Sequence, residues 1–168
     1  MAIRKIRLKD DELLRKKSRK VEKITPAIET LVADMAETMY EANGVGLAAP
    51  QVGILRRIVV IDVGDELFEM INPEIIKTEG EQTGSEGCLS LPGESATVTR
   101  PQKVTVRYMD LKGDEYELEG EDLLARAICH EVDHLEGILY IDKALPNTRK
   151  VEEAEKGSLE DRINKIEN

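Results

Sequence analysis

Residues 130–134 read His130-Glu131-Val132-Asp133-His134, which has the form H-E-x-x-H. On a helix, residues four apart lie one turn apart on nearly the same face, so both imidazoles can be aimed at one point. Two neutral imidazoles are good ligands for a divalent transition metal, and the carboxylate of Glu131 can take a proton from a group bound there. The pentapeptide therefore predicts a metal site on a helix.

The surrounding residues favour a helix, because apolar residues recur there at spacings of four, four and three. The chain has only two histidines, so all of its imidazole lies in this one motif. The alternative is a chance match, in which His130 and His134 are ordinary half-buried polar residues. The apolar stripe consists of Leu124, Ile128, Val132 and Leu135.

Composition bounds the class of protein. The chain has 168 residues, 40% of them apolar and 35% charged, and no apolar run approaches the roughly eighteen residues that a membrane span needs. We expect one catalytic domain over residues 1–147 and a charged, helical tail over residues 148–168. The N-terminus lacks the apolar segment of a secretory signal, so we expect a cytoplasmic protein.

The charge is negative overall but uneven. A formal net charge of −10 argues against general binding to nucleic acid. Residues 1–23 carry ten Lys/Arg and four Asp/Glu, and we interpret this basic start as a solvated face rather than a docking patch. Two cysteines do not make a disulfide framework, which fits a reducing compartment.

Cys88 is the candidate third metal ligand. It follows Gly87, where the backbone can turn sharply, and a thiolate with two imidazoles leaves one tetrahedral position open, as in catalytic sites. A lone cysteine is more often a small buried residue, which is the alternative for Cys88. Cys129 is the competing thiol, but it precedes His130 on the helix and points about 100° away, so we interpret it as packing.

Small residues fill the stretch 44–53, which reads G-V-G-L-A-A-P-Q-V-G. It lacks the G-K-[ST] of a phosphate loop. Taken alone, it is interpreted as a tight loop between a helix and a strand. The alternative is a backbone rim to which a peptide adds as a strand, with Gln51 as an oxyanion donor.

Secondary structure is predicted from periodicity and turn residues. Thr25 and Pro26 begin a helix that runs to about Ala42. Asn72-Pro73 predicts a turn, and residues 78–87 predict a polar loop. Strands are predicted over residues 57–62, 68–71, 104–109 and 116–119.

Three stretches together resemble the peptide deformylase family, which is marked in order by G-hydrophobic-G-L-A-A-x-Q, E-G-C-L-S and H-E-x-D-H. Here the motifs occupy residues 44–51, 86–90 and 130–134, within a similarity from about residue 5 to 146. The resemblance implies an α+β fold in which antiparallel β-strands pack around a central helix carrying the HExxH metal motif. It also implies a metallohydrolase that removes the N-terminal formyl group from formylmethionine of nascent polypeptides and releases formate.

The resemblance also implies a role for each motif residue. The expected metal ligands are Cys88, His130 and His134, the expected acid/base is Glu131, and the expected oxyanion donors are Gln51 and the backbone N–H of Leu89. Glu86 is expected to pair with Arg100. The candidates for the substrate-binding residues are Val45, Gly46 and Leu123.

The family is associated with Fe²⁺, and Zn²⁺ or Ni²⁺ is expected to substitute. Its implied partners are formyl-Met nascent peptides at the ribosome, and we expect a monomer with no membrane and no sequence-specific nucleic-acid binding. Two positions depart from the pattern of some members, which carry an arginine where Ser95 stands and an aliphatic residue near Gly84. These departures concern peptide contacts rather than the chemistry.

Three alternatives remain open at the level of sequence. A zinc endopeptidase would share the helix motif but would take its third ligand downstream, where Glu152 or Glu153 stands. A non-enzymatic metal-binding module would bind metal and have no activity that depends on Glu131. An inactive relative would lack part of the chemistry, yet every residue implied by the resemblance is present.

Overall fold

The computed structural model describes residues 2–152, and these fold into two antiparallel sheets and two α-helices. The helices are α1 (Pro26–Glu41) and α2 (Asp122–Leu135), with 3-10 turns η1 (Glu12–Arg15), η2 (Ala49–Val52) and η3 (Tyr140–Lys143). The strands are β1 (Gly46–Ala48), β2 (Ile58–Ile61), β3 (Phe68–Glu79), β4 (Gln82–Cys88), β5 (Leu91–Arg100), β6 (Lys103–Met109), β7 (Glu115–Glu121) and β8 (Lys150–Val151).

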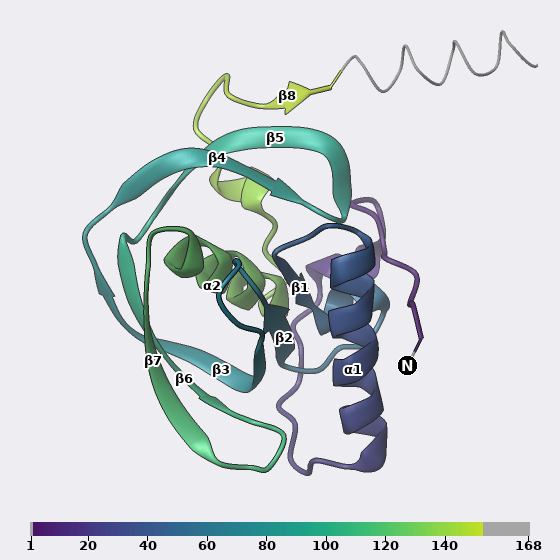
Figure 1. Cartoon of the computed structure of the whole chain (residues 1–168). Helices are drawn as coiled ribbons and strands as arrows, with labels where there is room; N and C mark the ends of the chain where they lie inside the picture. Colours follow the sequence, from purple (N-terminus) through teal and green to yellow (C-terminus); the bar gives the residue numbers. More distant parts are fainter. Residues whose placement is uncertain (1, 153–168) are drawn as a thin grey trace, which may run out of the picture.

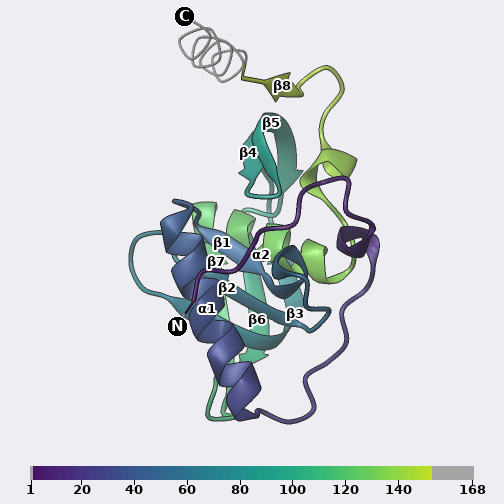
Figure 2. The ribbon, with the colours of Figure 1, turned by 90° about the vertical axis from the view of Figure 1, so that its right-hand side faces the viewer.

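The five-stranded sheet has the order β1-β2-β3-β6-β7, and the three-stranded sheet has the order β4-β5-β8. Helix α1 lies against one face of the larger sheet, and α2 lies against its other face, beneath the arch of β4 and β5 (Figures 1 and 2). The expected α+β fold, with antiparallel strands around the helix that carries residues 130–134, is confirmed.

The alternation of β2 explains why the larger sheet has a helix on each face. All four β2 residues are fully buried, and successive side chains of a strand point to opposite faces. Ile58 and Val60 pack in the cluster that contains α1 residues, whereas Val59 and Ile61 pack in the cluster that contains α2 residues. Because neither face of β2 meets water, the strand consists of a continuous apolar run, which here is β-branched, instead of alternating apolar and polar residues.

The first helix begins and ends close to the prediction. The side chain of Thr25 accepts a hydrogen bond from the backbone N–H of Ile28 at 3.3 Å, and Pro26 occupies the first helical position. The N-terminal segment crosses this helix, where Asp34 accepts hydrogen bonds from the backbone N–H of Ala2 at 2.7 Å and from Nε of Arg4 at 2.9 Å. The segment is thereby fixed to the body of the protein.

Two local predictions are wrong. Asn72-Pro73 is not a turn between strands but an irregularity inside β3, where the pairing with β6 shifts register between Ile71 and Glu74. Pro73 has no N–H for the ladder, and Asn72 takes a positive φ of 53° while its side chain bonds both the N–H and the carbonyl of Val21 at 2.8 Å. The predicted polar loop over residues 78–87 is mostly strand, in β3 and β4.

A third apolar cluster joins β5 to the segment after α2, and it includes Leu91, Val98, Leu139 and Tyr140. Beyond it, the first residues of the predicted tail form β8, which pairs with β5 at Glu94 and Ser95. The rest of the predicted tail, residues 153–168, lies outside the described residues. No helix in residues 2–152 is both long and apolar enough to cross a membrane.

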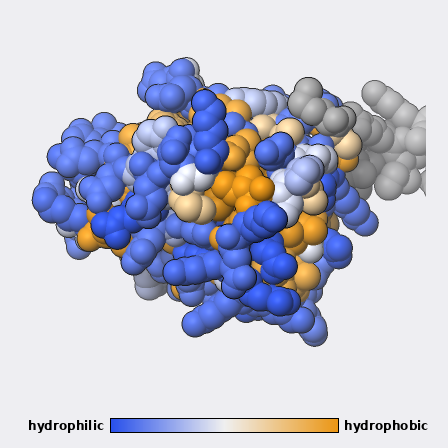
Figure 3. Space-filling model, turned by 90° about the horizontal axis from the view of Figure 1, so that it is seen from below, coloured by the Kyte–Doolittle hydropathy of each residue, from blue (hydrophilic) through white to orange (hydrophobic). Residues whose placement is uncertain are grey.

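Charged side chains cover most of the surface, in keeping with the composition. Seen from below, where α1 begins and the chain turns from β6 into β7, an apolar area is surrounded by hydrophilic residues (Figure 3). Partly buried apolar residues at the margin of the α1 cluster, such as Ile28 and Leu67, contribute to closing the core between α1 and the sheet.

Candidate metal centre

Helix α2 and strand β4 run side by side in matched register. Three α2 positions spaced by four meet three β4 positions spaced by two, because four helical residues rise about 6 Å and two strand residues about 6.6 Å. The guanidinium of Arg126 lies against Gly84, His130 bonds Glu86, and His134 contacts Cys88. The helix and the strand, whose pairing with β5 shifts register between Glu86 and Cys88, thus bring one thiol and two imidazoles together.

The three predicted metal ligands converge. Sγ of Cys88 and one ring nitrogen each of His130 and His134 all lie within 4.8 Å of one another. The Nε2 atoms of His130 and His134 are 3.2 Å apart, and Sγ of Cys88 is 3.4 Å from Nε2 of His134. Tetrahedral coordination with metal–nitrogen bonds of 2.0–2.1 Å and a metal–sulfur bond of 2.3 Å implies separations of about 3.3 and about 3.5 Å. The donor set therefore fits a divalent metal.

The bond between His130 and Glu86 fixes the orientation of the imidazole. Nδ1 of His130 lies 2.6 Å from Oε1 of Glu86, so Nδ1–H donates to the carboxylate and Nε2 keeps its lone pair toward Cys88. A carboxylate behind a ligating histidine is the usual arrangement in metal sites. For His134, burial lowers the pKa well below its ordinary value, which keeps this imidazole neutral.

Glu86 lies at the centre of a buried network. It accepts two hydrogen bonds from Arg100, at 2.8 and 3.1 Å, and one from Nη1 of Arg126 at 2.6 Å. Burial alone would raise the pKa of Glu86, but the hydrogen bonds from His130 and Arg100 outweigh it and lower the pKa to about 2. The group is therefore a carboxylate throughout the physiological range, and the expected pairing of Glu86 with Arg100 is present.

Glu131 is placed beside the ligands but does not belong to the donor group. Its Oε1 lies 4.0 Å from Nε2 of His130 and 3.9 Å from Nε2 of His134, and it has no hydrogen-bond partner within residues 2–152. Burial raises the pKa of Glu131 to about 7. Its carboxylate packs on Gly46, where an added Cβ would lie 2.7 Å from Oε2. A buried, unpaired oxygen facing the donors also indicates a group bound between them.

Gln51 and Leu89 flank the thiol. Oε1 of Gln51 accepts the N–H of Ala48 at 3.0 Å, which turns the amide nitrogen toward Ser90 Oγ at 3.0 Å and Cys88 Sγ at 3.5 Å. The backbone N–H of Leu89 has no acceptor among the described residues. Two groups with N–H donors thus lie next to the candidate ligands, and that of Leu89 has no acceptor among the described residues.

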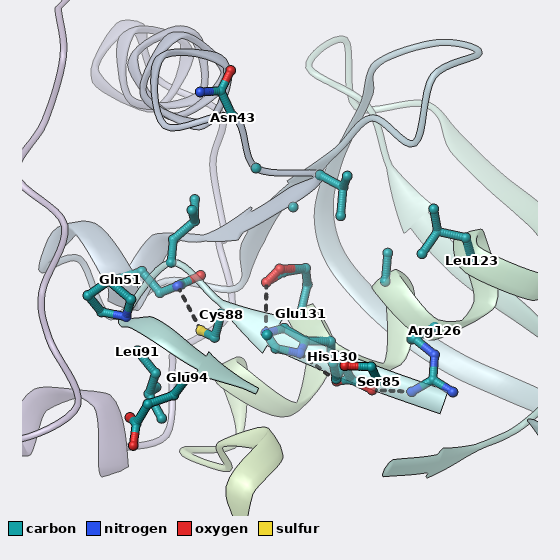
Figure 4. Close-up of a pocket in the computed structure, with 18 of the residues that line it drawn as sticks. Asn43, Gln51, Ser85, Cys88, Leu91, Glu94, Leu123, Arg126, His130 and Glu131 are labelled. Carbon is teal, nitrogen blue, oxygen red and sulfur yellow. Dashed lines mark hydrogen bonds and ion pairs between the residues drawn. The ribbon is translucent and has the colours of Figure 1, made fainter. Parts of the chain in front are cut away.

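A cavity of about 430 Å³ opens over this group, and we call it the central pocket. Gln51 and Cys88 lie toward one end and Leu123 and Arg126 toward the other (Figure 4). Val45 and Leu123 line it and are about half exposed. The predicted substrate-binding residues Val45, Gly46 and Leu123 are therefore brought together on its walls.

Two strand edges face the central pocket. In the larger sheet β1 pairs only with β2, and in the smaller sheet β4 pairs only with β5, so each has an edge without a strand partner within residues 2–152. Val45 and Gly46 come from the β1 side, and residues 85–87 come from β4. Residues of two unpaired strand edges therefore line the central pocket.

Sequence reasoning missed two residues that contact the site. Arg126 lies one turn before His130 and bonds Glu86, and its helical spacing from His130 was the available signal. The ring of Tyr140 stacks on His130 with centroids 5.9 Å apart, and no local sequence pattern predicts this contact.

Neither alternative ligand joins the donor group. Cys129 is buried in an apolar cluster and is not part of the donor group, and burial raises its pKa to about 11. Glu152 is exposed and its backbone N–H bonds the carbonyl of Gly93, while Glu153 lies outside the described residues. The third donor beside the two histidines is therefore Cys88.

Residues 3–150 match the family model described as polypeptide deformylase. The chain belongs to the polypeptide deformylase family. The peptide deformylase of Agathobacter rectalis is 64% identical over 143 residues, which cover 85% of this chain and 90% of that protein. The crystal structure of peptide deformylase from Thermotoga maritima is 41% identical with a TM-score of 0.84, covering 86% of this chain and 99% of that one.

A further deformylase structure, from Synechococcus elongatus in complex with actinonin, has a TM-score of 0.82 and 40% identity, covering 84% of this chain and 79% of that one. The resemblance found in the three sequence motifs is thus confirmed along most of the chain. As a deformylase, the protein is a metal-dependent hydrolase that acts on formylated nascent peptides.

Proposed function

We propose that this chain hydrolyses the formamide of N-formylmethionyl peptides at the centre formed by Cys88, His130 and His134, with Glu131 as the acid/base. The observation that supports this most is the position of the Glu131 carboxylate, 3.9–4.0 Å from both histidine Nε2 atoms at the floor of the central pocket. A group at that distance reaches a water held between itself and the donors.

Cys88, His130 and His134 would hold a divalent metal, which would supply Lewis-acid chemistry and lower the pKa of a bound water. Glu131 is placed to accept a proton from the water that attacks the formyl carbon and to deliver it to the leaving nitrogen as the C–N bond breaks, which yields formate and a free amine. A pKa of about 7 for Glu131 suits both transfers near neutral pH.

The developing oxyanion requires donors that are already in place. Nε2 of Gln51 and the backbone N–H of Leu89 are the candidates, since Ala48 fixes the Gln51 amide and Leu89 N–H has no acceptor among the described residues. One such donor lowers the activation barrier by about 3 kcal/mol.

We further propose that the peptide binds as an extended strand between the free edges of β1 and β4. Main-chain hydrogen bonds to both edges would orient it whatever its sequence, and the side chain of the first residue would enter the central pocket. Val45, Gly46 and Leu123 line that pocket, and the methionine side chain would cover the two exposed apolar groups.

We propose Fe²⁺ as the native metal, with Zn²⁺ or Ni²⁺ able to substitute. The donor set alone would favour Zn²⁺ by affinity order, so the choice of Fe²⁺ rests on the family. We propose that residues 1–147 are the catalytic domain and 148–168 the tail, and that the protein acts in the cytoplasm as a monomer on nascent chains at the ribosome.

Formate release tests this function against its rival. Protein loaded anaerobically with Fe²⁺ is incubated with formyl-Met-Ala-Ser, acetyl-Met-Ala-Ser and an unformylated peptide. We expect formate from the first, no deacetylation of the second and no internal cleavage of the third. Cys88→Ala is expected to lose metal and activity, whereas an endopeptidase that uses Glu152 would retain both; peptide-bond cleavage without formate would overturn the proposal.

A further inference from the structure

Arg126 places a buried guanidinium on the wall of the central pocket. The residue is only 7% exposed, and it lines the pocket together with Leu123, Ala127 and His130. It lies one helical turn before His130, so both side chains project from the same face of α2 toward β4.

Among residues 2–152, only Nη1 of this guanidinium has hydrogen-bond partners. Nη1 donates to Oε2 of Glu86 at 2.6 Å and to the backbone carbonyl of Val98 at 3.1 Å. Nη2 and Nε of Arg126 have no hydrogen-bond partner among residues 2–152. Arginine stays charged and its N–H groups are obligatory donors, so the donors that Glu86 and Val98 do not use are left for the bound molecule or for solvent.

Gly84 makes room for the unpaired side of the guanidinium. A Cβ added at Gly84 would lie 3.4 Å from Nη2 and 3.9 Å from the central carbon of Arg126. These separations are ordinary van der Waals contacts, so an aliphatic side chain at position 84 would pack on the guanidinium and add apolar surface beside it. Arg126 thus gives the central pocket a cationic wall next to the apolar Leu123.

We propose that Arg126 determines side-chain specificity by donating hydrogen bonds to an acceptor at the δ position of the formylated residue. The inference rests on the proposed function, in which that side chain enters the central pocket. The acceptor is the thioether sulfur of methionine or, more strongly, the oxygen of methionine sulfoxide. The substrates are thus formylated residues with a δ acceptor rather than linear side chains of the same length.

A substrate with norleucine as its first residue distinguishes hydrogen bonding by Arg126 from simple burial of an apolar side chain. Norleucine matches methionine in length but has a methylene in place of sulfur, so it leaves the donors of Arg126 without an acceptor. A buried donor left unpaired costs enough to reduce kcat/KM about tenfold, and the effect falls on KM because the contact is made equally in the ground state and the transition state.

The test compares kcat/KM for formyl-Met-Ala-Ser, formyl-Met(sulfoxide)-Ala-Ser and formyl-norleucyl-Ala-Ser. For the wild type we expect both methionine forms to exceed norleucine by about tenfold. Arg126→Met is expected to bring the methionine-to-norleucine ratio close to one and to disfavour the sulfoxide. Arg107→Met, which removes an exposed arginine paired with Glu117, is the matched control and should keep the wild-type ratios.

Ratios within one variant cancel any general loss that follows from the bond between Arg126 and Glu86. If Arg126→Met does not fold, Arg126→Lys and the wild-type ratio still decide the question. Equal kcat/KM for methionine and norleucine in the wild type, or an unchanged ratio in Arg126→Met, would overturn the inference and leave the deformylase function standing. No formate from any of the three peptides would overturn the proposed function and this inference with it.

Discussion

The Nδ1 atom of His130 lies 2.6 Å from Oε1 of Glu86, although 44 residues separate them in sequence. This bond sets the tautomer of His130 and so decides which nitrogen faces Cys88. The same carboxylate pairs with the buried guanidinium groups of Arg100 and Arg126, and Asp133 supplies a second carboxylate to Arg100. Metal binding and stability are therefore linked through one side chain.

Replacing Glu86 by glutamine tests that link. Glu86→Gln keeps the shape but removes the charge that holds Arg100 and Arg126, so we expect about 3 kcal/mol lower stability and a 10–100-fold weaker metal affinity. Chelator competition and thermal unfolding measure the two effects. The control is Glu119→Gln, which alters an exposed carboxylate near Lys103; a Glu86→Gln protein with wild-type metal affinity would contradict the account.

Gly46 is expected to position Glu131 by being small. An added Cβ at position 46 would lie 2.7 Å from Oε2 of Glu131, so Gly46→Ala must displace the carboxylate. A shift of about 1 Å in a catalytic group can lower kcat about a hundredfold. Metal content, measured by mass spectrometry, should stay at the wild-type value, since Gly46 is not among the donors. Full kcat in Gly46→Ala would contradict this prediction.

The two thiols are expected to differ in reactivity. Burial raises the pKa of Cys129 to about 11, so at pH 8 its thiol stays protonated and shielded. Cys88 lies in the central pocket. Iodoacetamide should modify Cys88 of the metal-free protein and spare Cys129, and bound metal should protect Cys88. Peptide mass spectrometry measures the alkylation of each cysteine. Faster labelling of Cys129 than of Cys88 would contradict the prediction.

The contacts of Asp34 with Ala2 and Arg4 should make the stability of the fold depend on pH in the acid range. The backbone N–H of Ala2, and then Arg4, lower the pKa of Asp34 below 3.8. A depressed carboxyl pKa stabilises the fold above the unfolded-state pKa of about 3.9, and the contribution disappears as the pH falls through the lower folded-state pKa. The difference in melting temperature between the wild type and Asp34→Asn should therefore be largest near pH 7 and should shrink as the pH falls below the unfolded-state pKa of about 3.9. A difference independent of pH would contradict the assignment.

The HExxH helix could be predicted because its signal is local. The spacing of His130 and His134 fixes their common face whatever surrounds the helix, and the apolar stripe indicates where α2 packs. The two motifs before it, around Gln51 and Cys88, have no local pattern that predicts a functional role. Taken alone, each predicts only packing or a turn, and a role follows only from the three motifs together.

Strand β4 could not be predicted, because its sequence opposes the assignment. Gly84 and Gly87 disfavour a strand, and the stretch has no apolar alternation. Its extended form comes from pairing with β5 over Gln82–Glu86, a contact that exists only in the folded chain. The partners of Glu86 were missed in part for the same reason, since the position of Arg126 beside it depends on where β4 lies.

The proposed function depends on proton transfer by Glu131 at a metal held by Cys88, His130 and His134. The most direct test is the rate of formate release from formyl-Met-Ala-Ser by the wild type and by Glu131→Gln, each at one Fe²⁺ per chain. We predict the same metal content in both proteins and a rate at least about a hundredfold lower in the variant. Formate release at the wild-type rate by Glu131→Gln, or none from the loaded wild type, would contradict the account.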